Sequence, residues 1–168
     1  MRRSFALIAC AIIFSLSLNA AGQDNKATSP SKYVPVTTYD PKRDAEADIK
    51  EAVMEAKRAG KRVLVDVGGE WCIWCHILDK FFEQNPALLE YREQNYVMVK
   101  INYSPENKNE KLLSRYPKIP GFPHLFILDA KGKLLHSQDT SELEEGKGYN
   151  LDRFSAFLKT WGRQAKTE

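Results

Sequence analysis

Two cysteines, Cys72 and Cys75, are separated by two residues in the segment Gly68-Gly69-Glu70-Trp71-Cys72-Ile73-Trp74-Cys75-His76. If a helix begins here, the first cysteine lies at its N-terminus, where free N–H groups and the helix dipole favour a thiolate. The second lies one turn further, near enough to attack a mixed disulfide formed on the first. The spacing therefore predicts a redox pair in which Cys72 is the nucleophile and Cys75 the resolving thiol. Trp71 would shield the pair and offer an aromatic surface to a partner.

The same residues allow three other interpretations. Cys72 to His76 matches the c-type haem attachment motif, although haem proteins of that type are mostly helical and need a second axial ligand. With His76 or His124 the cysteines could carry copper or zinc, although two thiolates and one histidine are too few for a closed tetrahedral zinc site. The third interpretation is an inert structural disulfide, but a loop closed between Cys72 and Cys75 is so short that it would stabilise the fold very little. We expect His76, His124 and His136 to be solvated or locally hydrogen-bonded.

The first 22 residues have the pattern of a secretory signal peptide. Arg2 and Arg3 precede an apolar run of 14 residues, 5–18, and Ala20-Ala21-Gly22 supplies the small residues of a cleavage site before Gln23. The run is shorter than the roughly 20 residues that span a bilayer, so a retained membrane anchor is the weaker alternative. We expect the mature chain in the periplasm or secreted, where thiols meet an oxidising environment. It would then keep only the two cysteines of the pair.

Composition indicates one globular domain. The chain has 168 residues, of which 43% are hydrophobic and 28% charged, a balance typical of folded proteins. The formal net charge is +3, and removal of the first 22 residues lowers it to about +1. A nucleic-acid binder would need a cluster of positive charge, so this class is excluded.

The expected elements alternate between helices and strands. Residues 23–40 read as a polar tether, with a short edge strand at 33–36 as an alternative. A helix capped by Asp40, with Pro41 as its first residue, should run to Gly60. The remaining expected helices span 72–84, 86–93, 107–115 and 151–161, the expected strands span 62–67, 96–102, 124–128 and 133–136, and 142–148 forms an exposed loop. Such an order predicts an α/β fold with helices on both faces of a sheet.

From roughly Ala45 to Trp161 the chain resembles the thioredoxin superfamily. Val65-Asp66-Val67 followed by Glu70-Trp71-Cys72-x-x-Cys75 is similar to the family's active-site strand and turn, and Gly121-Phe122-Pro123 is similar to its cis-proline loop. More narrowly, it resembles secreted thioredoxin-like disulfide reductases and isomerases with an additional N-terminal helix. The resemblance implies a thioredoxin-like fold over 41–165, a central mixed β-sheet flanked by helices.

The resemblance also assigns roles to residues. Cys72 and Cys75 match the redox-active disulfide, and Asp66 matches the buried acid that moves a proton to or from the resolving thiol; the alternative is that Asp66 faces solvent. Pro123 matches the cis-proline that faces the disulfide and exposes backbone to an extended substrate, and an ordinary loop proline is its alternative. With Trp71 and Phe122 it would form the substrate-binding surface. Ile73-Trp74 replaces the Gly-Pro of ordinary thioredoxins, so the redox potential is expected to differ from theirs.

We therefore expect an exported thiol–disulfide oxidoreductase that reduces or isomerises disulfides of other proteins, with reduction favoured. Its partners would be cysteine-containing exported proteins and a redox partner that recycles Cys72–Cys75. No dissociable cofactor, metal, nucleic acid or stable membrane insertion of the mature chain is expected. The alternative function is that of a thioredoxin-like copper carrier, since related copper chaperones use cysteines at a different spacing.

Overall fold

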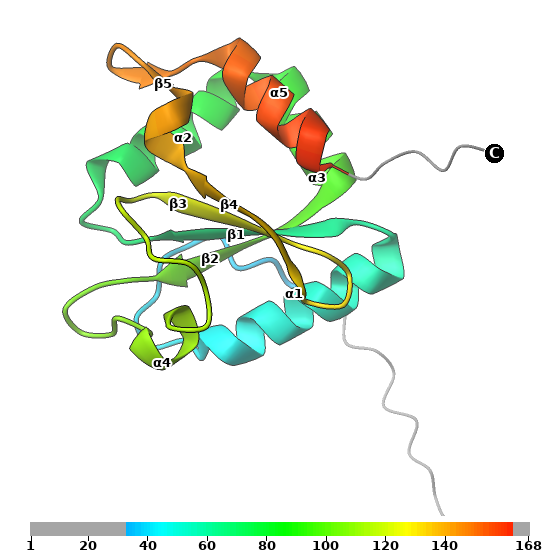
Figure 1. The fold of residues 1–168 in the computed structure, drawn as a ribbon, viewed down its shortest axis with the longest axis vertical. Coiled ribbons are helices and arrows are strands. Elements are labelled where there is room, and N and C mark those ends of the chain that lie inside the picture. Colours follow the sequence, from blue (N-terminus) through cyan, green and yellow to red (C-terminus); the bar gives the residue numbers. More distant parts are fainter. Residues whose placement is uncertain (1–32, 163–168) are drawn as a thin grey trace, which may run out of the picture. The chain divides into compact units, whose positions relative to one another are not determined.

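A four-stranded mixed sheet with the strand order β2-β1-β3-β4 forms the centre of the computed structural model, which describes residues 33–162 (Figure 1). The strands are β1 (Arg62–Gly68), β2 (Tyr96–Asn102), β3 (His124–Leu128) and β4 (Leu134–Asp139). β1 pairs in parallel with β2, whereas β3 is antiparallel to both β1 and β4. The central position of β1 explains why its sequence is apolar at nearly every residue, because both of its faces are covered.

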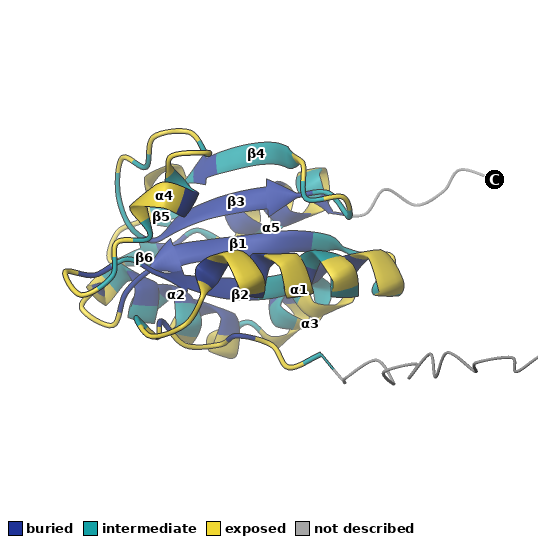
Figure 2. Ribbon diagram, turned by 90° about the horizontal axis from the view of Figure 1, so that it is seen from below, coloured by how far each residue is buried: buried dark blue, intermediate teal, exposed yellow. Residues whose placement is uncertain are grey.

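Helices cover the two faces of the sheet (Figure 1). One face packs against α1 (Ala45–Ala59) and the single turn α4 (Glu110–Leu113), and the other against α2 (Ile73–Gln84), α3 (Pro86–Asn95) and α5 (Leu151–Trp161). Alternate residues of β1 serve the two cores: Val63, Val65 and Val67 face α1, and Leu64 faces α2. Figure 2 shows the buried central strands and the exposed outer side of α1. Asp66 falls on the α2 side, in an otherwise apolar layer.

The first helix begins later than the sequence suggested. Its N-cap is Asp44, whose carboxylate accepts hydrogen bonds from the backbone N–H groups of Glu46 and Ala47. Asp40 instead accepts from the N–H of Lys42 in a preceding turn. The expected cap was wrong because Asp44 pairs two of the free N–H groups that a helix start exposes. Gly60 ends the helix as expected, with a positive φ of 66°.

The segment 142–148 is exposed at Glu142 and at residues 145–147, as expected, but it is more ordered than a simple loop. A 3-10 turn, η1 (Thr140–Leu143), leads into a hairpin of β5 (Glu144–Glu145) and β6 (Gly148–Tyr149). Leu143 and Tyr149 are buried in the core under α5. The burial of these two side chains holds the hairpin against the core, whereas the charged residues Glu145 and Lys147 are exposed at its turn.

Residues 33–40, the described part of the expected tether, lie against the domain. Val36 bridges Val99 of β2 in the parallel sense, and its carbonyl oxygen accepts from the N–H of Lys100 at 3.0 Å. Three residues later, Tyr39 is buried. The expected signal peptide and residues 23–32 lie outside the described residues.

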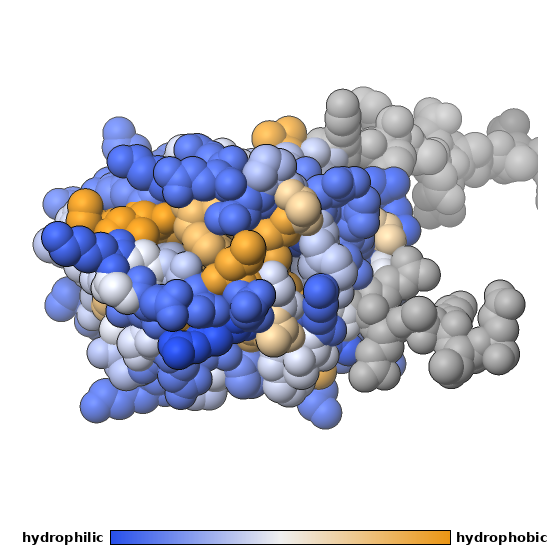
Figure 3. All heavy atoms as spheres, turned by 90° about the horizontal axis from the view of Figure 1, so that it is seen from above, coloured by the Kyte–Doolittle hydropathy of each residue, from blue (hydrophilic) through white to orange (hydrophobic). Residues whose placement is uncertain are grey.

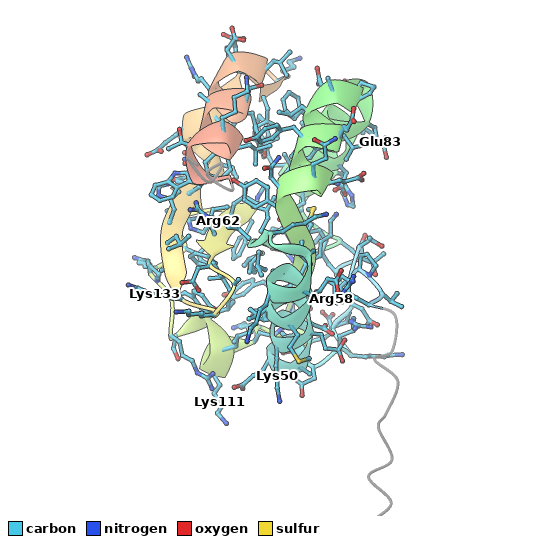
Figure 4. All side chains as sticks on the ribbon, turned by 90° about the vertical axis from the view of Figure 1, so that its right-hand side faces the viewer. Lys50, Arg58, Arg62, Glu83, Lys111 and Lys133 are labelled. Atoms are coloured by element: carbon cyan, nitrogen blue, oxygen red, sulfur yellow. A yellow bond between two sulfur atoms is a disulfide. The ribbon has the colours of Figure 1, made fainter. Side chains whose placement is uncertain are left out.

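The outer surface is largely charged. Figure 4 shows Lys50 and Arg58 of α1, Lys111 of α4 and Glu83 of α2, which are all exposed. On the side of α2, α3 and α5, Figure 3 shows a hydrophilic surface broken by apolar patches. Within residues 33–162, no helix combines the length and apolar character needed to cross a membrane.

Candidate active site

Cys72 and Cys75 form a disulfide at the start of α2. Cys72 is the N-cap of the helix, and its sulfur accepts from the backbone N–H of Cys75 at 3.1 Å. This N–H group and the dipole of the helix favour the Cys72 thiolate once the disulfide opens. Cys72 is 3% exposed and Cys75 is fully buried, so Cys72 is the sulfur nearer to solvent. These positions match those predicted for a nucleophile and a resolving thiol.

Gly68, the last residue of β1, makes room for the pair. A Cβ at this position would collide with the Sγ of Cys75, and would lie 3.0 Å from both Cζ and the hydroxyl oxygen of Tyr39. Residue 68 therefore has to lack a side chain for Cys75 and Tyr39 to occupy this space. In the adjoining turn, the N–H of Cys72 donates to the carbonyl oxygen of Gly69 at 2.9 Å.

Asp66 is fully buried on the same face of β1 as Gly68, since alternate residues of a strand point to the same side. The alternative that Asp66 faces solvent is therefore wrong. Burial raises its pKa from 3.8 to about 6, and the positive charge of Lys100 opposes that rise. Both carboxylate oxygens lack a hydrogen-bond partner among the described residues. An acid with such a pKa can exchange a proton near neutral pH.

Lys100 brings a cation beneath the site. It pairs with Asp66 across the β1–β2 register, and its ammonium group lies 2.6 and 2.7 Å from the carboxylate oxygens of Asp79 on α2. The same ammonium nitrogen lies 4.5 Å from the centroid of the Tyr39 ring. Lys100 is buried, so its charge acts on its neighbours with little screening by water.

Phe122, next to the disulfide, is flanked by the rings of Trp71 and Tyr103. Trp71 is 56% exposed and meets Phe122 edge to face, and Phe122 stacks on Tyr103. The Trp71 indole N–H donates to the carbonyl oxygen of Tyr103 at 2.7 Å, which fixes the exposed ring in place. Phe122 also packs against the cysteine pair. A groove of about 670 Å³ adjoins this surface, and its lining includes Tyr39, Pro41, Trp71, Tyr103 and Pro105.

Pro123 is buried, and the peptide bond that precedes it is cis. Its carbonyl oxygen accepts from the hydroxyl of Thr140 at 2.6 Å, which ties this loop to the start of η1. The backbone of Phe122, one residue earlier, makes no such bond to another described residue. An extended substrate would therefore meet the backbone of Phe122 in this loop.

The histidines make local contacts. Nε2 of His76 lies 2.8 Å from the carbonyl oxygen of Glu70, and Nε2 of His124 lies 2.8 Å from the hydroxyl of Ser137. His136 stacks on Trp161. Within residues 33–162, no three or more His, Cys, Asp or Glu side chains gather in a group that could hold a metal ion.

Sequence reasoning missed several residues of the site. Lys100 could have been predicted, because a lysine in an apolar strand needs a partner of opposite charge. Parallel pairing of the two strands places it opposite Asp66. Tyr39 could not have been predicted, because it stands in a polar segment before the first helix. The sequence around Thr140 and Tyr103 also gave no indication of their roles. These roles depend on hydrogen bonds that involve the carbonyl oxygens of Pro123 and Tyr103, which only the fold brings into reach.

Comparison with known proteins gives consistent matches. The model of the family described as Thioredoxin-like matches residues 44–130. Disulfide bond reductase DsbH of Chlamydia pneumoniae is 32% identical over 94 residues, 51% of this chain and 56% of that protein. Thiol:disulfide interchange protein DsbD of Pseudomonas fluorescens is 29% identical over 117 residues, 68% of this chain and 18% of that protein. A crystal structure of a disulphide isomerase from Xylella fastidiosa matches with a TM-score of 0.61 at 25% identity, covering 76% of this chain and 98% of that one.

The chain thus aligns with little more than half of DsbH and less than a fifth of DsbD.

Proposed function

Because the chain belongs to the thioredoxin-like family, we propose that it is an exported thiol–disulfide oxidoreductase that reduces or isomerises disulfides of other proteins. The observation that carries the proposal is the Cys72–Cys75 disulfide at the start of α2, with Asp66 buried on the adjoining strand.

The fold expected from the resemblance is confirmed. A mixed four-stranded sheet carries helices on both faces, and α1 precedes the first strand. The names of two relatives, a disulfide bond reductase and a thiol:disulfide interchange protein, support the proposed oxidoreductase activity.

The reaction proceeds in two thiol–disulfide exchanges. The Cys72 thiolate attacks a substrate disulfide, one substrate sulfur leaves as a thiolate, and a mixed disulfide forms on Cys72. The Cys75 thiolate then attacks the Cys72 sulfur, releases the second substrate thiolate and closes the Cys72–Cys75 disulfide. Substrate gains two electrons and the pair loses two. A redox partner that supplies electrons returns the pair to its dithiol form, so no dissociable cofactor takes part.

Asp66 supplies the proton acceptor for the second exchange. Cys75 is buried and must lose its proton before it attacks, and a carboxylate with a pKa raised to about 6 is ionised at neutral pH and basic enough to accept it. Lys100 keeps the carboxylate ionised by opposing the effect of burial.

Client proteins would dock on the aromatic surface of Trp71 and Phe122. Phe122 packs against the cysteine pair and Trp71 packs against Phe122. A solvent-exposed tryptophan held by a hydrogen bond offers contact area at little cost in conformational entropy. The Phe122 backbone would pair with an extended client segment, with Pro123 holding the loop against the disulfide.

The proposed export is supported by the first 22 residues, with their basic start, apolar run and small residues before Gln23. The protein would act in the periplasm or outside the cell on cysteines of other exported proteins. Reduction is the direction we favour, in line with the name of the Chlamydia relative, a disulfide bond reductase.

Reduction of a protein disulfide by the wild type and by cysteine variants tests the proposal. Cys72→Ala should abolish reductase activity, since no nucleophile remains. Cys75→Ala should accumulate mixed disulfides with clients, detected as reductant-sensitive bands on gels. Cys10→Ser, which alters the third cysteine of the chain, is the matched control and should keep full activity. Retained activity in Cys72→Ala would contradict the assignment of the nucleophile.

A further inference from the structure

Tyr39 comes from the segment before α1, outside residues 44–130 that the family match covers, yet it touches the redox pair. Its side chain is 2% exposed and forms a small buried cluster with Cys72 and Cys75. A Cβ at Gly68 would lie 3.0 Å from the Tyr39 hydroxyl oxygen and closer still to the Sγ of Cys75. The hydroxyl and the resolving sulfur therefore border the same small space over Gly68.

Three buried oxygens near this space lack partners in the disulfide form. They are the hydroxyl of Tyr39 and both carboxylate oxygens of Asp66, none of which has a hydrogen bond to another described residue. Buried polar groups in native proteins are nearly always paired, so this cluster needs an explanation. The two side chains are close enough to affect each other: after burial, the charge of Asp66 is the next largest cause that raises the pKa of Tyr39.

We propose, resting on the oxidoreductase function above, that Tyr39 is a proton-relay residue that connects the thiol of Cys75 to the carboxylate of Asp66. The group that completes the hydrogen bonds is the Cys75 thiol, which the closed disulfide does not offer. In the mixed disulfide, the Cys75 S–H donates to the Tyr39 oxygen while the Tyr39 O–H donates to Asp66.

The relay moves two protons in one step. As Cys75 attacks the Cys72 sulfur, its proton passes to the Tyr39 oxygen and the Tyr39 proton passes to Asp66, which becomes neutral. The Cys72–Cys75 bond forms and the bond from Cys72 to substrate breaks. Substrate leaves as a thiolate with the bonding electrons and takes its proton from solvent. Tyr39 ends the step as it began, and Asp66 later returns its proton to solvent.

Tyrosine suits this position because its hydroxyl stays neutral. Burial raises the pKa of Tyr39 well above its ordinary value, with the Asp66 charge as the next cause, so the hydroxyl passes on a proton only by accepting another. The ammonium group of Lys100 lies over the ring and orients it. The charged and titratable groups that act on Tyr39 and Asp66 are Lys100 on β2, Asp79 on α2, Arg92 on α3 and Tyr149 on β6.

The test follows both exchanges in the full chain carrying Cys10→Ser, so that Cys72 and Cys75 are the only thiols. The reduced protein is mixed with one equivalent of an aromatic disulfide whose released thiolate is coloured. The first equivalent of colour reports attack by Cys72, and the second reports resolution by Cys75. Tyr39→Phe should leave the first phase unchanged and slow the second by about 100-fold, the lower end of the usual contribution of general acid–base catalysis.

Tyr33→Phe is the matched control. It removes a hydroxyl from the same segment that donates to the carbonyl oxygen of Met98, away from the sulfurs, and should change neither phase. The pH midpoint of the second phase should move upward in Tyr39→Phe, because the hydroxyl lowers the pKa of Asp66. In an Asp66→Asn background, Tyr39→Phe should have no further effect, since the acceptor of the relay is already lost.

Stability separates a relay from a packing role. The hydroxyl is buried without a partner, so Tyr39→Phe should leave the oxidised protein at least as stable as the wild type in urea. In the wild-type protein, a plot of the rate of the second phase against the deuterium fraction of the solvent should be curved. Transfer of two protons in one step gives such a curve, whereas transfer of a single proton gives a straight line. This measurement needs no variant, so it holds even if Tyr39→Phe fails to fold.

Three results would overturn the relay: a second phase of wild-type rate in Tyr39→Phe, equal slowing of both phases, or a linear dependence on the deuterium fraction. A wild-type protein that releases no colour at all would instead overturn the proposed function, and the relay with it.

Discussion

Asp66→Asn should stabilise the oxidised protein at neutral pH and leave its stability nearly unchanged in acid. The carboxyl is fully buried, and its pKa in the folded protein is about 6 against an ordinary value of 3.8. The difference corresponds to about 3 kcal/mol, because each pH unit is worth roughly 1.4 kcal/mol. Asparagine keeps the shape of the neutral acid without the charge, so it avoids the cost of ionising a buried group.

The direction follows from proton linkage. Between pH 3.8 and about 6 the folded protein binds the Asp66 proton more tightly than the unfolded chain does. The stability that this proton contributes is complete below pH 3.8 and is lost as the pH rises through about 6. The variant lacks this loss, so its advantage over the wild type should grow across that window and stay constant above it.

Urea unfolding of the oxidised wild type and variant, in steps from about pH 4 to pH 8, measures the difference directly. Glu83→Gln is the control, since it removes the same charge from an exposed position on α2 (Figure 4) and should show no such pH dependence. A stability difference that is the same at both ends of the pH range would refute Asp66 as a buried titrating acid.

Three further predictions concern the groups around the pair. Gly68→Ala should cost the oxidised protein about 1–3 kcal/mol in urea, because its Cβ meets Cys75 and Tyr39; Gly121→Ala, with no atom within 4 Å of its Cβ, is the control, and equal effects would contradict the account. Thr140→Val should cost about 1–3 kcal/mol by leaving the Pro123 carbonyl oxygen unpaired, whereas Thr140→Ser should recover most of that loss; a neutral valine would argue against the bond. Lys100→Met should raise the pKa of Asp66 and move its titration, followed by the same urea series, to higher pH; an unmoved midpoint would exclude Lys100 as its counter-charge.

Sequence reasoning succeeded where one local rule determines the structure. The strand from Arg62 onward is apolar and β-branched, which is typical of a buried central strand, and the structure places it there. The helix after Cys72 and its end near Asn85 follow from apolar spacing and from Pro86, which disfavours a helical residue before it.

The missed features depend on contacts between distant residues. Nothing in the neighbourhood of Tyr39 shows that its ring reaches Cys75, since the space for it exists only because residue 68 is glycine. The hairpin between Leu143 and Tyr149 was not predicted because its strands have two residues each, too few for an alternating pattern. The prediction of Asp40 as the helix cap was wrong because residue propensities locate a helix start only to within a few residues, and α1 begins just after Asp44.

Redox titration of the cysteine pair tests the central claim most directly. The Cys10→Ser chain is equilibrated with dithiol and glutathione buffers, and its thiols are counted by alkylation. We predict a two-electron transition of Cys72 and Cys75 together, within the range of about −270 mV for thioredoxin to about −120 mV for strong protein oxidants. A potential near the lower value would support reduction, and one near about −180 mV would support isomerisation. Cysteines that never titrate as a pair would contradict the oxidoreductase function.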